Sequence, residues 1–161
     1  MKERVKIPLT KLINGKVFNP PLPNSLTNNE KPVRLAELKV SCSERKRLYL
    51  MIEFYSFILT NRIIQEKKNE VQLLFSLLRK KDKSKNRKTI QTWPFSREII
   101  TKTPESATVK VNEPILLSVC DTIILNGNAS YILEVNRVSV SDGSSYDITK
   151  KSITGVVTEC Q

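Results

Sequence analysis

The chain has 161 residues, of which 27 are lysine or arginine and 16 are aspartate or glutamate, so its formal net charge is +11. It has no histidine and only four scattered glycines, which removes the commonest general base and excludes a glycine-rich phosphate loop. We therefore expect one non-enzymatic domain that needs no cofactor and no metal, with a charge that favours polyanionic partners.

The cysteines and the hydropathy pattern indicate the cellular compartment in which the protein is expected. Its three cysteines, Cys42, Cys120 and Cys160, are odd in number and lack a CxxC spacing, which is typical of free thiols in a reducing compartment. The N-terminus lacks the apolar core of a secretory signal, and no apolar stretch is long enough to span a bilayer. These features predict an intracellular protein, cytoplasmic or nuclear, that is neither secreted nor transmembrane.

Residues 1–32 contain five of the eight prolines. Proline fixes φ and removes a backbone donor, so the segment should be extended. It is expected to be a flexible arm or a strap laid over the body. The remaining residues, 33–161, are expected to form a single β-rich domain.

The segments that follow the arm differ in the spacing of their apolar residues. Residues 36–42 alternate apolar and polar side chains, which predicts a half-buried strand. For residues 43–65, the length, the capping Ser43 and the absence of internal glycine and proline favour a helix, although alternation from Leu48 to Phe54 also fits a long strand. Residues 70–80 are expected to return as a strand beside the first.

The C-terminal part predicts hairpins. Short strands are expected in EIITKT and ATVKV, followed by three strands from Ile115 onward. Asn126-Gly127 and Asp142-Gly143 are dipeptides of tight hairpin turns, so the three strands should form an antiparallel meander. The fold class expected is α+β or mainly β: an antiparallel sheet or barrel-like core with a C-terminal meander, one helix and an extended N-terminal arm.

The most concentrated charge lies at residues 79–88, which hold seven cations and one acid. Repulsion among them predicts an exposed loop that contacts phosphates, with affinity but little sequence readout. A second basic group opens the 43–65 segment, and Trp93 follows the loop as a stacking platform or a buried indole. The candidate anion-binding residues are Arg79, Lys80, Lys81, Lys83, Lys85, Arg87, Lys88, Trp93, Arg45, Lys46 and Arg47.

Other interpretations of this loop stay open: a solvated loop without a partner, a nuclear-localisation run, or a contact with an anionic membrane surface. Charge alone does not distinguish lipid from nucleic acid.

The order of parts resembles the matrix proteins of rhabdoviruses. It is carried by PPLP in the arm, AELKVSC, the 43–65 segment and the sheet-rich part from Ile115. The resemblance implies a virion-associated structural protein that self-associates and links a ribonucleoprotein to a membrane. A PPxY motif is absent, because Leu22 and Pro23 follow Pro20-Pro21. The alternatives are a nucleic-acid-binding subunit with an OB-type barrel, and a β-domain that only binds a protein partner.

Overall fold

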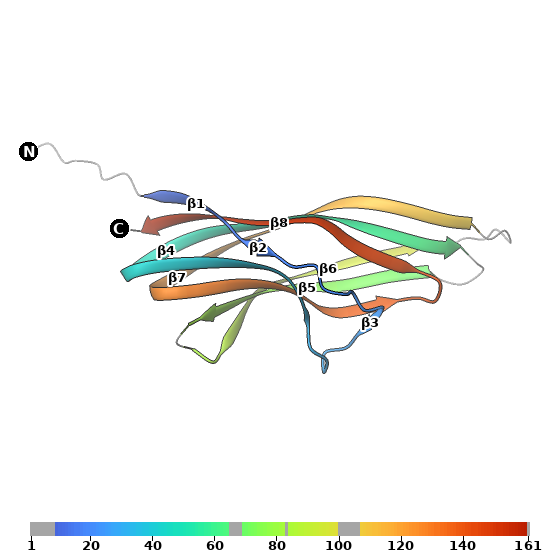
Figure 1. The fold of residues 1–161 in the computed structure, drawn as a ribbon, viewed down its shortest axis with the longest axis horizontal. Helices are drawn as coiled ribbons and strands as arrows, with labels where there is room; N and C mark the ends of the chain where they lie inside the picture. Colours follow the sequence, from blue (N-terminus) through green and yellow to red (C-terminus); the bar gives the residue numbers. More distant parts are fainter. Residues whose placement is uncertain (1–8, 65–68, 83, 100–106, 161) are drawn as a thin grey trace, which may run out of the picture.

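The computed structural model describes residues 9–64, 69–82, 84–99 and 107–160 (Figure 1). These residues form a mainly antiparallel β structure, in which no helix occurs that could cross a membrane. The sheet order is β1-β8-β4-β7-β5-β6, with β2 paired to β4 and β3 to β7. The strands are β1 (Thr10–Asn14), β2 (Lys16–Val17), β3 (Ser25–Leu26), β4 (Val33–Ile64), β5 (Asn69–Lys81), β6 (Arg87–Ile99), β7 (Ala107–Val140) and β8 (Ser145–Cys160).

The two longest strands, β4 and β7, pair with each other and fold back together. The Tyr131 hydroxyl donates to Asp121 Oδ2 at 2.7 Å, although both residues belong to β7 and are ten positions apart. Ten extended residues would span about 33 Å, so β7 must reverse between them. The β4–β7 register shifts between Cys42 and Lys46, at the same place. Figure 1 shows both ribbons returning at this end.

The fold-back divides the sheet into two layers. The first layer contains β1, β8, the second half of β4 (46–64) and the first half of β7 (107–125). The second layer contains the first half of β4 (33–42), the second half of β7 (127–140), β5 and β6, with β2 and β3. This order is that of a jelly roll. Because β1 and β6 end the path without pairing to each other, the sheet is open and is not a barrel.

The core lies between the layers, and it corrects the expectation of a helix at 43–65. Buried and accessible side chains alternate along this part of β4. A helix would have to bury Leu50 and Phe54 on a second face, whereas a strand places them on the same side as Leu48 and Ile52. The alternation that we set against length and capping was therefore the stronger signal. The inward residues of this half are Leu48, Leu50, Ile52, Phe54, Ser56, Ile58, Thr60 and Arg62.

The expected meander is also wrong, although the turn residues mark real reversals. Gly127 and Gly143 have φ of 103° and 75°, which glycine adopts without strain. Each turn carries the chain from one layer to the other, so the strands on either side do not pair: the halves of β7 pair with β4, and β8 pairs with β1 and β4. Similarly, β5 is a strand as expected, but it pairs with β6 and β7 instead of β4.

The proline-containing N-terminal segment joins both layers. It pairs with β8 through β1, then with β4 through β2 and with β7 through β3. The Gly15 amide donates to the Ile153 carbonyl at 2.8 Å where the segment crosses. Farther on, the Tyr146 hydroxyl donates to the Pro23 carbonyl at 2.9 Å. From β1 onward this segment is a strap along one side of the molecule.

Candidate polyanion-binding end

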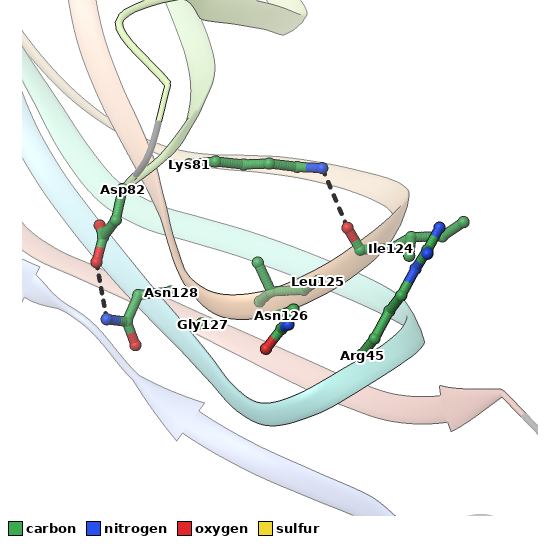
Figure 2. Close-up of a pocket in the computed structure, with 8 residues that line it drawn as sticks. All are labelled: Arg45, Lys81, Asp82, Ile124, Leu125, Asn126, Gly127 and Asn128. Carbon is green, nitrogen blue, oxygen red and sulfur yellow. Dashed lines mark hydrogen bonds between the residues drawn. The ribbon is translucent and has the colours of Figure 1, made fainter.

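Three reversals of the chain meet at one end of the molecule: the fold-backs of β4 and β7, and the turn between β5 and β6. The Asp82 amide donates to the Asn128 carbonyl at 3.2 Å, and Asn128 Nδ2 donates to Asp82 Oδ2 at 2.7 Å. These bonds fix the β5–β6 turn beside the β7 fold-back. A hollow of about 440 Å³ opens there (Figure 2). It is lined by Arg45, Lys81, Asp82, Ile124, Leu125, Asn126, Gly127 and Asn128.

The two basic groups found in the sequence therefore converge in space. Arg45 lies in the β4 fold-back and Lys81 ends β5, and both line the same hollow. The β5–β6 connection is shorter than the loop expected at 79–88, because β5 continues to Lys81 and β6 begins at Arg87. This hairpin is stabilised by a bond from the Ser84 amide to the Lys81 carbonyl at 2.9 Å. We define the basic end as residues 45–47 together with residues 80–88.

Arg79 is used inside the protein. Its Nη1 lies 2.5 Å from Asp121 Oδ2, and the two side chains are only 13% and 12% exposed. The same carboxylate accepts the Tyr131 hydroxyl. Burial raises the pKa of Tyr131 well above its usual value, and the hydrogen bond to Asp121 adds to this. The charge of Arg79 is therefore neutralised by Asp121 within the fold and is not presented to a ligand.

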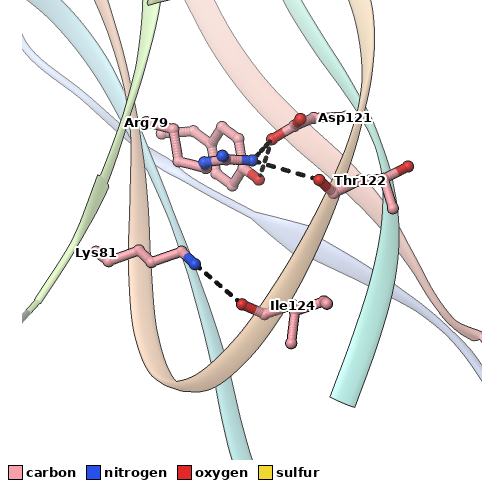
Figure 3. Close-up of polar contacts among 6 residues, drawn as sticks. Arg79, Lys81, Asp121, Thr122 and Ile124 are labelled. Atoms are coloured by element: carbon pink, nitrogen blue, oxygen red, sulfur yellow. Dashed lines mark hydrogen bonds and ion pairs between the residues drawn. The ribbon is translucent and has the colours of Figure 1, made fainter. Parts of the chain in front are cut away.

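Lys81 has a mixed role. Its Nζ donates to the Ile124 carbonyl at 3.1 Å, on the edge of β7, and Figure 3 shows this bond beside that of Arg79 to the Thr122 carbonyl. The first half of β7 is an edge segment of its layer, so these carbonyls have no strand partner there. Two β5 cations thus satisfy edge acceptors of the opposite layer. Lys81 is nevertheless exposed and lines the hollow.

Two other candidate cations form ion pairs at the margin of the basic end. Arg87 Nη1 lies 3.2 Å from the buried Glu134, and the arginine side chain is still 52% exposed. Burial raises the pKa of Glu134, while Arg87 and Arg34 act in the opposite direction. Lys46 Nζ lies 2.8 Å from Glu159 Oε2, and this hydrogen bond raises the pKa of Lys46. Both pairs reduce the charge available to a ligand.

The remaining candidates are accessible cations. None of them forms an ion pair with another residue of the described part of the chain. Two acids lie nearby, Glu44 and Asp82, and the latter is held by Asn128. Lys83 lies outside the described residues. The accessible set is Arg45, Arg47, Lys80, Lys85 and Lys88, of which Lys80 is half-buried and the others are exposed.

Trp93 is not at the basic end. It lies on β6 opposite Phe75, is half-buried and packs against the core. This position fits the buried-indole interpretation better than a stacking platform. Sequence reasoning overlooked Asn126 and Asn128, which line the hollow beside the cations. The NGN sequence was available, but we interpreted it only as a hairpin turn.

The described residues gather no group of three or more histidine, cysteine or acidic side chains that could hold a metal ion. The chemistry of this end is therefore that of cations and amides around an open hollow. Neither the known family models nor the curated proteins give a match to this chain.

Proposed function

We propose that this protein is a non-enzymatic assembly protein that binds a polyanion, a nucleic acid or ribonucleoprotein, through its basic end. The observation that supports it best is the convergence of two basic groups that are more than 30 residues apart in the sequence. Three of the candidate cations are paired with acids of the fold. Five others are accessible and form no ion pair with another described residue, and Arg45 among them lines the hollow together with Lys81.

The composition of the basic end suggests how it would bind. Lysine and arginine neutralise phosphates and release counterions, so affinity should fall steeply as salt rises. The cations follow no regular spacing, and the one tryptophan packs against the core. We therefore expect backbone recognition with little base preference.

The matrix-protein resemblance implies the same role and adds a membrane contact and self-association. Of the pieces that carry it, residues 43–64 are strand instead of helix, so the resemblance stays an expectation. The open sheet of eight strands that the described residues form is not the five-stranded barrel of an OB fold. A domain that only binds a protein partner is the rival that the experiment below excludes or supports.

The test compares three double variants that each lose two cations. Arg45→Ala/Arg47→Ala and Lys85→Ala/Lys88→Ala remove charge from the two arms of the basic end. Lys110→Ala/Arg137→Ala removes exposed charge near the start and near the end of β7, at the opposite end. Binding of a labelled single-stranded RNA is measured by fluorescence anisotropy over about 50–200 mM salt.

Each basic-end variant should weaken binding more than tenfold in dilute buffer and lower the salt slope by about 1.4, since a single-stranded phosphate contact contributes about 0.7. Thermal stability should hardly change, because these side chains are exposed. The opposite-end variant should bind almost as the parent does. Equal losses in all three variants would show a diffuse field instead of a site, and a parent chain that ignores RNA would refute the proposal. Binding of anionic liposomes in place of RNA would favour the membrane contact.

A further inference from the structure

The outer, solvent-facing side of the first layer carries several large apolar side chains along β4. Along the second half of β4 the outward side chains include Tyr49, Met51, Tyr55 and Leu59, which are 44%, 37%, 39% and 36% exposed. Antiparallel sheets usually place polar residues on the solvated face. This face instead carries aromatic, methionine and leucine side chains, the types enriched in protein interfaces.

The apolar positions continue in part onto the neighbouring strands, where they alternate with hydroxyl side chains such as Ser118 of β7 and Thr154 of β8, both paired with Glu53. Leu116 of β7 is paired with Tyr55, and Val156 of β8 with Met51. Leu12 of β1 lies beside Val156 and is 66% exposed. We define the apolar face by the outward residues Tyr49, Met51, Tyr55, Phe57, Leu59, Leu116, Cys120, Val156 and Leu12.

The size of the apolar face suits a protein partner. Three to four strands of about 4.8 Å spacing, over the roughly 40 Å from Arg47 to Leu59, give roughly 600 Å² of flat sheet. Projecting side chains enlarge the accessible area beyond this figure. A stable interface needs about 800 Å² from each partner, which this face can supply when its polar positions are included.

The charges on the apolar face suggest which partner it meets. Glu53 precedes Tyr55 by two positions on β4, on the outward side. Lys150 lies on the other side of Tyr55, with its Nζ 5.3 Å from the centre of the Phe57 ring. Lys150 has φ of 50° at a register shift of β8, a conformation that costs a residue with a side chain some energy. Glu53 and Lys150 therefore lie on opposite sides of the centre of the face as one acid and one base. Two further outward charges, Arg47 and Asp147, lie toward its two ends, and Asp147 is paired with Leu59.

The positions of Glu53 and Lys150 allow two copies of the face to pair with each other. A two-fold axis in the plane of the interface, perpendicular to the strands at Tyr55, places Glu53 of one copy opposite Lys150 of the other, twice. An axis parallel to the strands would place Glu53 opposite Glu53. We propose that the apolar face binds a second copy of this chain, sheet against sheet, with the strands antiparallel across the two-fold axis. The inference deepens the assembly part of the proposed function, and it uses residues outside the basic end.

Charge exchange tests the geometry as well as the contact. The mass of the parent chain in solution, followed by sedimentation over a concentration series, should reach twice the 18.4 kDa of one chain. Glu53→Lys alone and Lys150→Glu alone should each shift the monomer–dimer midpoint at least tenfold, because each creates two like-charge contacts. The double exchange should restore most of the dimer.

Further variants show whether the face itself is the contact. Leu116→Asp should give a monomer with an unchanged Tm, because Leu116 is 60% exposed. Thr92→Asp introduces the same charge at an exposed position of β6 and should leave the dimer intact. Alkylation of the exposed Cys120 thiol should slow as the chain concentration rises.

Several outcomes would overturn the inference. These are a parent chain that is monomeric at all concentrations, a dimer that survives Leu116→Asp, or a double exchange that is no better than either single change. Binding of neutral liposomes by a monomeric chain, lost in Leu116→Asp, would assign the face to lipid instead. RNA binding is measured separately, so a monomer that binds RNA refutes only this inference, whereas a dimer that ignores RNA refutes only the proposed function.

Discussion

At the scale of single residues, the cations of residues 79–88 divide into two classes. Arg79 and Arg87 meet Asp121 and Glu134, while their neighbours Lys80, Lys85 and Lys88 form no ion pair with another described residue. The sequence predicted the cluster of cations at residues 79–88, but it did not predict which of them pair with acids. The acids lie 42 and 47 positions away from their arginines, and only the fold-back of β7 brings Asp121 opposite β5.

The Arg79–Asp121 pair should matter for stability. Asp121→Asn keeps the volume and an acceptor for Tyr131, but it leaves the nearly buried guanidinium without a counter-charge. We expect a loss of about 2–4 kcal/mol in the free energy of unfolding, below the full cost of breaking a deeply buried pair because both groups keep some solvent contact. Urea denaturation measures it.

A more exposed pair provides the control. Arg97 and Glu113 lie 2.8 Å apart with side chains 44% and 26% exposed, so Glu113→Gln should cost less than about 1 kcal/mol. Equal effects of Asp121→Asn and Glu113→Gln would contradict the role that we assign to the inner pair.

At the scale of elements, the local sequence pattern predicted several strands and turns, but it did not predict which strands pair with each other. Alternation predicted the strand at 36–42, and the strand expected at 70–80 is present as β5. The Asn-Gly and Asp-Gly dipeptides predicted where the chain reverses. The helix at 43–65 was wrong because a strand with one buried face and one apolar outer face leaves few polar positions to mark its period. The expected meander was wrong because a glycine turn serves a hairpin and a passage between layers equally well.

The strap depends on one glycine. A Cβ at Gly15 would lie 2.4 Å from the Glu37 carbonyl oxygen and equally close to Ile153 Cγ2. Because the first contact is backbone, Gly15→Ala should displace the strap where it crosses between layers. We expect a loss of about 2 kcal/mol or more, together with faster proteolysis of the N-terminal segment at temperatures below the Tm.

Gly127 gives the comparison for this prediction. It has no atom within 4 Å of the added Cβ but a φ of 103°, so Gly127→Ala should cost about 1–2 kcal/mol through backbone strain alone. In the Gly127→Ala variant the N-terminal strap should be cleaved by protease at the same rate as in the parent chain. If Gly15→Ala left both stability and proteolysis unchanged, the crossing would not hold the strap in place.

At the scale of the whole molecule, the two proposals combine in one geometry. The basic end lies at the Arg47 end of the second half of β4, and the proposed two-fold axis passes near Tyr55. Rotation about an axis perpendicular to the strands reverses their direction, so the two basic ends of a dimer would point in opposite directions. Such a dimer would bridge two nucleic-acid strands instead of binding one strand twice.

Bridging is therefore the property that needs both surfaces. RNA carrying one fluorophore should be retained on beads that hold a second RNA only when the dimeric parent chain is present. Glu53→Lys should bind each RNA singly but should not bridge, because its dimer is weakened while its basic end is intact. The double exchange Glu53→Lys/Lys150→Glu, with the parent's net charge, should restore bridging. Bridging by a variant that sedimentation shows to be monomeric would mean that one chain holds two strands, and the link between dimer geometry and assembly would be wrong.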